Sequence, residues 1–580
     1  MTAGGSTVTY GYDGMGRIGS AGIPAGTFSY SYLNTSTKVV SLSRGGQEVV
    51  SKTYDQLARL TKISSFANSA PLREYSYVYN NSDERTKVTF ADGKYIDYTY
   101  DLAGQLVTAQ KFNAVGAMQL ADYAYNYDSM GNPLQRNSNG QERSYTFNNL
   151  NQFTSATAPT KTDVAGVVGP EVVEPKVAVN GLPVPPADPD SEGNWIIKDI
   201  PLNTGSNTLT TEVKDKFNRV KTDTRSVTLA QAPVFTYDLN GNTTGDGTWT
   251  YTWNEENRLV EAIKSNAGIP ACKLEFSYDG QGRRRVKKVY NWSGSDWLLS
   301  SELRFVYDQN NMVAELDANN AVQKSYTWGI DLSGSEQGAG GVGGLLSVSV
   351  GVLSVFFPSF DGNGNITAYL DTAGTVVYSC FYSPFGKTIE ETGVKPCDFG
   401  FSTKPLDVET GLNYYIFRYY DQQLGRWLNR DPVGEEFFLK LFTKDKSDDE
   451  KEEIERKSLS ALYIFLKNTP LTNHDYLGLI TVPLIEGFCC SCSGGTWWTG
   501  PTPQSGTPCT PYEFILKKEI YIGQSPAVCG PRPTFPPTIT CHGFCRLLFY
   551  YQCTRGTSVT TGKPVYIWIV IGKYAGICLP

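Results

Sequence analysis

The stretch YTYDLAGQLVTA, Tyr98–Ala109, sets the fold of this 580-residue chain. Its aromatic residues alternate, which places them on one face of a strand. Asp101 then supplies an Asx-type turn and Gly104 a residue that accepts a positive φ, so the unit predicts a β-hairpin. One such hairpin cannot bury its apolar face alone, and a stable sheet therefore needs many neighbours stacked beside it.

The same unit recurs along most of the chain. An aromatic alternation that ends in Tyr-Asp or Phe-Asp, followed by a small-residue turn, occurs in Tyr10–Ile18, Lys52–Ile63, Tyr125–Leu134, Phe235–Gly245, Phe276–Arg285, Phe305–Leu316 and Pro358–Leu370. The recurrence predicts a mainly β fold, in which a spiral of hairpins covers residues 1–154 and 233–400.

Residues 155–232 interrupt the repeats with a different sequence pattern. A Pro/Val-rich linker leads into short alternating strands that contain one tryptophan, Trp195, and no cysteine. This pattern predicts an inserted β-sandwich of the immunoglobulin-like kind. Glycan binding, contact with a partner and a plain spacer role all stay open for it, because no binding residues stand out.

Composition excludes several kinds of site. Two histidines in the whole chain nearly exclude a His-rich metal centre, and we expect neither a metal nor a cofactor. The first residues, MTAGGSTVTYGYDG, have no basic and apolar segments of a secretory signal. The apolar stretch Gly343–Phe357 is too short and too rich in Gly and Ser to span a membrane, so we predict a buried strand there.

The composition changes at Leu479. Nine of the 12 cysteines follow it, and the tail carries +4 of a total charge of −7, which leaves −11 for the rest. Such a cysteine density suits a disulfide framework in an oxidising compartment, with one thiol left over or paired between molecules. Zinc at the cluster Cys489–Cys492, or around Cys541 and Cys545, is an alternative, although no second CxxC completes the pattern.

Together with the Tyr-Asp units, four longer segments resemble the Rhs/YD-repeat family. Tyr326–Leu346 is similar to the segment before the Rhs-associated core, and Phe381–Lys387, Phe401–Gly434 and Ala461–Leu479 are similar to the core itself. The resemblance implies a hollow β-shell, complete or partial, that encloses the chain's own C-terminal segment, and a core at 401–479 that plugs it. In the family this segment is usually a toxin that varies between relatives.

Two Asp-containing turns of the core match the family's self-cleavage motif. Asp431–Gly434 (DPVG), preceded by Arg430, matches the first half. Asp475–Leu479 (DYLGL) matches the second half, except that Tyr476 stands where proline is usual. The resemblance implies an aspartyl-type cut between Leu479 and Ile480.

Cleavage of this kind requires two carboxyl groups that lie close together and are shielded from bulk water. One of them then donates a proton while the other activates a water molecule. We expect Arg430 to hold one carboxylate ionised. Asp431 and Asp475 are also ordinary turn formers, and their separation of 44 positions (475 − 431) is about twice that usual in the family. The extra residues, 435–460, predict a charged helix that loops out, or that docks a partner, and leaves the two aspartates free to meet.

Residues 480–580 form a variable Cys-rich domain that resembles no toxin family we recognise. With no Asp and one His, it cannot supply a Ser-His-Asp triad by itself. A candidate acid–base site consists of His542 and Arg546 with either Glu513 or Glu519. The positive charge of the tail favours a phosphate-bearing target. A structural histidine beside a disulfide is the alternative.

Two functions follow from these features. The first is a bacterial, secreted or surface-exposed carrier whose cargo is its own C-terminal segment, with an immunity protein and a secretion-system or surface component as further partners. The second is a structural or adhesive surface protein with an inert aspartate pair and a disulfide-stapled tail.

Overall fold

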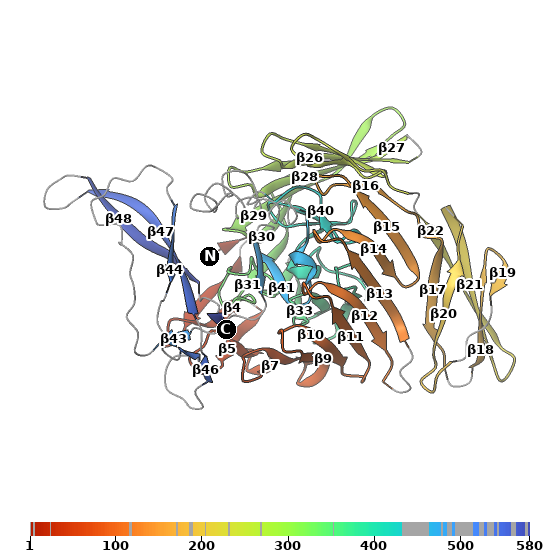
Figure 1. The fold of residues 1–580 in the computed structure, drawn as a ribbon, viewed down its shortest axis with the longest axis horizontal. Helices are drawn as coiled ribbons and strands as arrows, with labels where there is room; N and C mark the ends of the chain where they lie inside the picture. The colour runs from red at the N-terminus through yellow and green to blue at the C-terminus, as the bar shows by residue number, and fades with distance from the viewer. Residues whose placement is uncertain are drawn as a thin grey trace. The chain divides into compact units, whose positions relative to one another are not determined.

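The computed structural model describes residues 2–3, 6–23, 25–114, 119–169, 172–184, 189–203, 205–229, 232–266, 269–351, 353–431, 463–476 and, beyond these, the strands of the tail. The chain divides into two compact units. The first contains residues 1–32, 37–55 and 59–484, and the second contains 33–36, 56–58 and 485–580. Strands dominate, as the repeats predict (Figure 1).

The repeats before the insert form one 14-stranded antiparallel sheet in which each strand pairs with the next in the chain. Its strands are β3 (Thr9–Tyr12), β4 (Ile18–Ile23), β5 (Gly26–Tyr32), β6 (Val39–Arg44), β7 (Gln47–Tyr54), β8 (Leu60–Ala67), β9 (Ala70–Tyr79), β10 (Arg85–Phe90), β11 (Tyr95–Tyr100), β12 (Leu106–Phe112), β13 (Gln119–Tyr127), β14 (Pro133–Ser138), β15 (Gln141–Phe147) and β16 (Phe153–Ala156). A short pair, β1 (Thr2–Ala3) and β2 (Ser6–Thr7), precedes it.

The turn after Tyr100-Asp101 is built as the sequence predicts. Asp101 Oδ1 accepts the backbone N–H groups of Ala103 and Gln105, both at 2.9 Å, and Asp101 Oδ2 accepts the Gln105 side-chain amide at 2.9 Å. Gly104 takes a φ of 77° and donates its N–H to the Asp101 carbonyl. The aspartate therefore closes its own turn with partners no more than four residues away.

Several tyrosines at the end of a repeat strand tie their hairpin to an earlier one; most precede Asp, whereas Tyr32 precedes Leu33 and Tyr79 precedes Asn80. The Tyr100 hydroxyl donates to the Arg85 carbonyl oxygen at 2.7 Å. The same contact joins Tyr32 to Ile18, Tyr54 to Val39, Tyr79 to Leu60, Tyr127 to Leu106 and Tyr278 to Leu259. A buried hydroxyl that is satisfied in this way lets the ring fill the core without leaving a polar group unpaired.

The insert folds as two small antiparallel sheets. One pairs β17 (Lys161–Val167) with β20 (Asn194–Pro201), and the other has the order β19 (Leu182–Val184), β18 (Val172–Val179), β21 (Gly205–Asp215), β22 (Val220–Leu229). Trp195, 3% exposed, packs in their common core with Val177, Ile197 and Leu209. The insert is thus a β domain with its own core, and its immunoglobulin-like topology stays a prediction.

A second 14-stranded antiparallel sheet follows the insert, again in chain order. Its strands are β23 (Thr236–Tyr237), β24 (Thr243–Gly245), β25 (Trp249–Trp253), β26 (Leu259–Asn266), β27 (Ile269–Tyr278), β28 (Arg284–Trp292), β29 (Trp297–Asp308), β30 (Asn311–Asp317), β31 (Val322–Trp328), β32 (Leu345–Val350), β33 (Ser354–Phe360), β34 (Ile366–Leu370), β35 (Val376–Tyr382) and β36 (Thr388–Gly393). Of the stretch Gly343–Phe357, residues 345–350 lie in β32 and residues 354–357 in β33, so strand is confirmed, but as two paired strands with Leu353 exposed at their turn rather than one buried strand. In the described residues, no helix has the length and hydropathy needed to cross a membrane.

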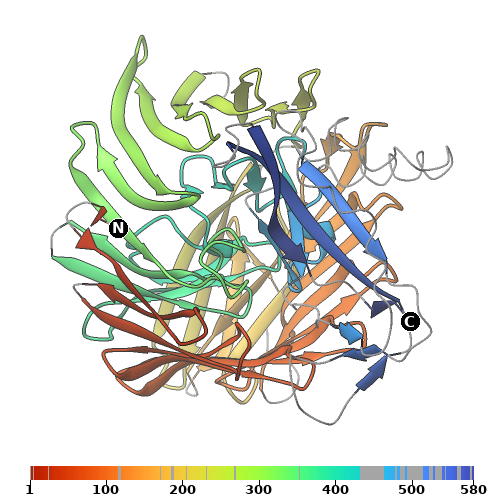
Figure 2. The same cartoon turned by 90° about the vertical axis from the view of Figure 1, so that its left-hand side faces the viewer.

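The core segment lies between the two large sheets (Figures 1 and 2). It contains the 3-10 turns η1 (Phe401–Thr403) and η3 (Leu466–Asn468), the sheet β37 (Leu406–Asp407), β38 (Leu412–Tyr414), β39 (Tyr419–Asp421), β40 (Arg426–Trp427), and β41 (Asn473–Tyr476). Tyr415, Tyr420 and Phe465, which are completely buried, pack against aromatic residues of β9–β13. Tyr414 and Tyr419 pack against β25–β27. Aromatic side chains of the core therefore occupy the space between the sheets.

The tail is described only as strands. These are β42 (Ile480–Pro483), β43 (Cys490–Cys492), β44 (Phe514–Ile520), β45 (Ala527–Cys529), β46 (Ile539–Cys541), β47 (Phe544–Thr557), β48 (Pro564–Tyr574) and β49 (Cys578–Leu579). The predicted helix at 435–460, His542 and Glu513 lie outside the described residues, as do the side chains of the tail cysteines. Pairing of β44 with β47 sets Glu519 opposite Leu547 and Arg546 opposite Ile520.

Candidate functional site

An arginine within the most aromatic part of the core lies at the centre of the site. The turn between β38 and β39 is tight: Ile416 takes a φ of 69°, and the Tyr415 N–H donates to the Arg418 carbonyl at 3.0 Å. This turn directs Arg418 into the core, where its guanidinium stacks on the Trp427 ring at 4.0 Å from the centroid. The side chain is 2% exposed, so its charge requires anionic partners.

Both predicted aspartates are those partners. Arg418 Nη1 lies 3.0 Å from Asp431 Oδ2, and Arg418 Nη2 lies 3.2 Å from Asp475 Oδ2. One guanidinium therefore joins carboxylates that are 44 positions apart in the chain. The Asp475 side chain is 1% exposed and that of Asp431 is 19% exposed, which leaves Asp431 as the carboxylate with access to water.

The chain returns to the core after residues 432–462. The Trp427 N–H donates to the Tyr463 carbonyl at 3.0 Å, and Arg426 forms a β-bridge with Ile464. Tyr463 and Ile464 therefore lie beside β40. The long separation in sequence does not prevent Asp431 and Asp475 from meeting.

Arg430, which the sequence analysis expects to hold a carboxylate, lies next to a different part of the core. A Cβ atom placed on Gly241 would meet Arg430 Cδ at 2.5 Å and the Tyr463 hydroxyl at the same distance. Arg430 thus packs over the β23–β24 turn, where Gly241 has a φ of 86°. Among the described residues, the guanidinium that contacts both carboxylates is Arg418.

The expected cleavage site lies in a hairpin. β41 pairs with β42 in antiparallel register, with Asp475 opposite Thr481 and Tyr476 opposite Ile480. Residues 477–479 connect the two strands and lie outside the described residues. Asp475 is therefore part of the strand that leads directly into the Leu479–Ile480 bond.

Two further titratable groups lie at the site. Lys404 is 5% exposed and donates to the Gly340 carbonyl at 2.5 Å. Burial lowers the pKa of Lys404 to about 8, although the nearby Asp475 opposes the shift. His474 is 3% exposed, and neither ring nitrogen has a hydrogen-bond partner in the described part of the chain. Burial, together with Lys404, lowers the pKa of His474 to about 4, so its ring is neutral at physiological pH.

A glycine-rich loop holds Lys404 in place. The carboxylate of Asp331 accepts the N–H groups of Ala339 and Gly341, at 2.7 and 3.0 Å, which closes the loop over residues 331–341. The loop presents the carbonyl of Gly340 to the amine of Lys404. The Gly-rich segment before the core thus has a structural use that its composition does not reveal.

The charges of the site restrict its protonation. Asp431 and Asp475 supply two negative charges, and Arg418 supplies one positive charge. In a low-dielectric interior the remaining negative charge is costly unless a proton, or the ammonium of Lys404, balances it. The arrangement can therefore hold one ionised and one protonated carboxyl, as aspartyl chemistry requires. No group of three or more His, Cys, Asp or Glu among the described residues is arranged to hold a metal ion.

Sequence reasoning missed Arg418, although one signal was present. The run NYYIFRYYD, 413–421, contains a single cation among aromatic residues that are largely buried in the structure. A buried arginine almost always has an anionic partner, so this residue was a candidate for the group that binds Asp431.

Comparison with known families agrees with this architecture. The sequence profile described as Teneurin YD-shell matches residues 190–471, which include the second large sheet and most of the core segment. The chain is a Rhs/YD-repeat shell protein. This confirms the family resemblance that the Tyr-Asp units and the core motifs indicate.

Individual relatives of this YD-repeat shell are much longer proteins. The tRNA3(Ser)-specific nuclease WapA of Bacillus spizizenii is 31% identical over 199 residues, which are 34% of this chain and 8% of that protein. Toxin subunit YenC2 of Yersinia entomophaga is 24% identical over 414 residues, 63% of this chain and 40% of that protein. The crystal structure of TcdB2-TccC3-Cdc42 shares 16% identity with a TM-score of 0.34, over 78% of this chain and 22% of that one. The chain spans less than half the length of the curated relatives it matches.

Proposed function

We propose that this YD-repeat shell carries its C-terminal segment as a toxin cargo and cuts itself between Leu479 and Ile480, with Asp431 and Asp475 as the catalytic carboxyl groups. The observation that carries the proposal is the shared contact of both aspartates with Arg418, at 3.0 and 3.2 Å. This contact brings together the two carboxyl groups that the cleavage motif marks, in a largely buried site of the kind that aspartyl chemistry needs.

The exposure of the two carboxyl groups suggests their roles. Asp431, which is partly exposed, is the base that removes a proton from water as the water oxygen attacks the Leu479 carbonyl carbon. Asp475, which is 1% exposed, is the acid that donates its proton to the Ile480 nitrogen as the C–N bond breaks. The products are a new carboxylate on Leu479 and a new amine on Ile480.

Arg418 is then a positioning residue. Its fork fixes the two carboxyl groups relative to each other, and its charge favours ionisation of the one that acts as base. The sequence predicts this role for Arg430. That residue lies against Gly241 instead, so we assign the role to Arg418.

The relatives support the cargo half of the proposal. WapA of Bacillus spizizenii is named as a nuclease and YenC2 of Yersinia entomophaga as a toxin subunit. The matches to both are consistent with a bacterial carrier that is secreted or displayed at the surface. The composition break at Leu479 coincides with the end of the core segment, as a variable cargo requires.

Intact mass spectrometry of the expressed chain tests the cut. The chain is expected to yield a 101-residue fragment that begins at Ile480, and the Asp431→Asn and Asp475→Asn variants are expected to yield none. Asp371→Asn is the matched control, because Asp371 closes an ordinary repeat turn through the N–H groups of Ala373 and Thr375. A single uncut species from all four proteins would overturn self-cleavage and favour a structural surface protein.

Toxicity of the cargo is tested separately. Expression of residues 480–580 alone in a bacterial cytosol is expected to stop growth, whereas expression of the uncut Asp475→Asn chain in its place is expected to leave growth unchanged. Normal growth with the free segment, at a confirmed expression level, would contradict the toxin half and leave the cleavage half intact.

A further inference from the structure

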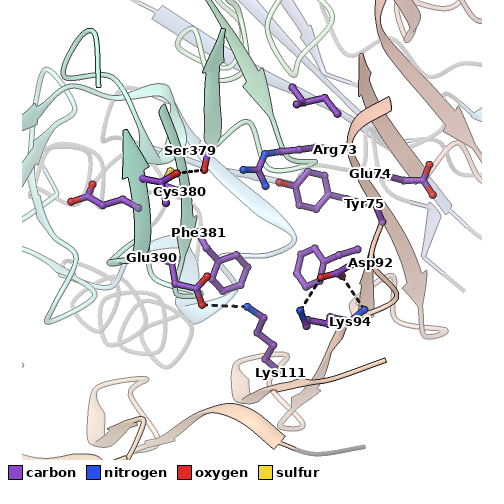
Figure 3. Close-up of a pocket in the computed structure, with 15 residues that line it drawn as sticks. Arg73, Glu74, Tyr75, Asp92, Lys94, Lys111, Ser379, Cys380, Phe381 and Glu390 are labelled. Carbon is purple, nitrogen blue, oxygen red and sulfur yellow. Dashed lines mark hydrogen bonds and ion pairs between the residues drawn. The ribbon is translucent and has the colours of Figure 1, made fainter. Parts of the chain in front are cut away.

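A cavity of 330 Å³, whose lining does not include Asp431 or Asp475, opens between the two large sheets (Figure 3). One wall comes from β9–β12 and contributes Arg73, Tyr75 and Phe90, and the other comes from β35 and β36 and contributes Phe381. The aromatic rings contact one another edge to face: the centroids of Phe90 and Tyr75, and of Phe90 and Phe381, are 5.8 Å apart. Part of the lining is therefore a preformed aromatic surface.

The four acidic side chains of this cavity already have partners. Glu74 pairs with Lys62 at 2.6 Å, Asp92 with Lys94 at 3.1 Å, and Glu390 with Lys111 at 3.5 Å. Glu391 accepts the hydroxyl of Tyr378 at 3.0 Å. In Figure 3, Glu74 also points away from the cavity. Three of the acidic groups are thus paired with a lysine, and Glu391 is bonded to a hydroxyl.

Arg73 is the exception. It forms no ion pair among the described residues, and its Nε is buried without a hydrogen-bond partner there. In Figure 3 its guanidinium and the hydroxyl of Tyr75 point into the cavity toward β35. A half-buried guanidinium that has an unpaired donor and no counterion is costly unless an anion completes it.

The Arg73 cavity continues inward. A smaller cavity of 70 Å³ shares Tyr75, Phe90, Lys111 and Phe381 with it and is walled by apolar residues that include Val88, Ile96 and Leu471. Together the two spaces offer the guanidinium of Arg73 at the entrance, with no ion pair among the described residues, and an aromatic interior whose lining also includes Arg85 and Asp361. A phosphate, with its greater charge, would face the four acidic groups, so a single carboxylate suits the entrance better.

We propose that the Arg73 cavity is a binding site for a small carboxylate with an apolar or aromatic body. The carboxylate accepts hydrogen bonds from the Arg73 guanidinium and the Tyr75 hydroxyl. The body packs against Phe90 and Phe381 and extends toward Val88 and Ile96.

Calorimetric titration of the full chain tests this site with three probes of the same shape. These are 3-phenylpropionate, its neutral amide and 3-phenylpropylamine. Because the free charge in the cavity is a cation, the acid is expected to bind at least about tenfold more tightly than the amide, and the amine is expected not to bind.

Variants assign the binding to Arg73. Arg73→Gln is expected to weaken 3-phenylpropionate at least about tenfold, and Phe381→Leu to weaken the acid and the amide alike. Arg304→Gln is the control, since Arg304 pairs with Glu302 on β29 outside the cavity lining.

Three results would overturn the proposal. They are equal affinity for the acid and the amide, unchanged binding by a folded Arg73→Gln variant, and no binding of the acid at millimolar concentration. If Arg73→Gln fails to fold, the affinities of the unaltered chain for the acid and the amide still show whether the site selects a carboxylate.

Discussion

Aspartates serve this protein in two contrasting regions, the repeat turns and the core site. In the turns, Asp101 and its equivalents accept backbone N–H groups two and four residues further along the chain. At the core site, Asp431 and Asp475 instead meet Arg418, 13 and 57 positions earlier in the chain (431 − 418 and 475 − 418). The turn aspartates are satisfied by local structure, whereas the core aspartates depend on the assembled fold.

This difference determines how each region responds to mutation. A turn that loses its aspartate can be solvated by water, and neighbouring hairpins hold the strands in register. A buried ion cluster has no such substitute, because removal of one member leaves the others as uncompensated charges. We therefore expect a substitution to cost more stability when the charged partners of the residue are distant in sequence than when they lie within the same turn.

The largest effect is expected at Arg418. Arg418→Met leaves two carboxyl groups without their cation, so it should lower the free energy of unfolding by about 5 kcal/mol and abolish the fragment that begins at Ile480. Denaturant unfolding and intact mass spectrometry measure the two outcomes. Arg418→Lys sharpens the test, because an ammonium keeps the charge but cannot form the fork, and should leave a folded chain with little cutting. Normal cleavage in Arg418→Lys would show that the fork is dispensable.

Mutation of a second buried ion cluster should also destabilise the fold, although this cluster has no role in the proposed cleavage. Asp407 pairs with Arg284 at 2.6 and 3.0 Å and with Lys287 at 3.0 Å, and its side chain is 3% exposed. Asp407→Asn should destabilise the fold by about 3 kcal/mol, since Arg284 loses its counterion. Denaturant unfolding in the Asp431→Asn background, where no cut is expected, isolates this effect. A decrease in the free energy of unfolding of less than about 0.5 kcal/mol would mean that this cluster contributes no more stability than an exposed ion pair.

An acid-dependent effect is expected at His474. Its pKa is about 4 in the folded chain and 6.5 when unperturbed, so the unfolded state takes up the proton first. Stability attributable to His474 is therefore complete above pH 6.5 and is lost as the pH falls toward 4, by up to about 3 kcal/mol. Comparison of unfolding curves of the parent and His474→Leu across this window, again in the uncut background, measures the difference. Parallel curves would contradict it.

The smallest effect is expected in the repeat turns. Asp101→Ala removes the acceptor for two backbone N–H groups, which water can partly replace, and should cost about 1 kcal/mol. Tyr100→Phe loses one hydroxyl contact to Arg85 and should cost a similar amount. Thermal unfolding measures both. A loss as large as that of Arg418→Met would refute the distinction between local and non-local aspartates.

Much of the fold was predictable from local pattern. The alternation in Tyr98–Ala109 gave the strand face, and Asp101 with Gly104 gave the turn, because both depend on residues within one hairpin. The segment Gly343–Phe357 was likewise assigned to strand, although it forms two paired strands rather than one. The order of strands followed from the repeat, since consecutive hairpins have no closer neighbours with which to pair.

The candidate site was predictable only in part. The motifs around Asp431 and Asp475 marked the two carboxylates, but Arg430 was chosen for its adjacency in sequence. A side chain next to an aspartate in a turn has no fixed direction relative to it, and Arg430 extends toward Gly241 instead. Arg418 reaches both carboxylates because a turn with Ile416 at positive φ aims it inward.

The sequence by itself determined the hairpin repeat and the break in composition at Leu479, because each is a local property of the chain, and its resemblance to the Rhs/YD-repeat family singled out the two aspartates. Tertiary structure alone decided which cation joins Asp431 to Asp475, that the core fills the space between the sheets, and that Arg73 keeps an unpaired charge in a cavity. Those outcomes depend on which strands meet across the interior, and contacts between residues hundreds of positions apart leave no local pattern to read.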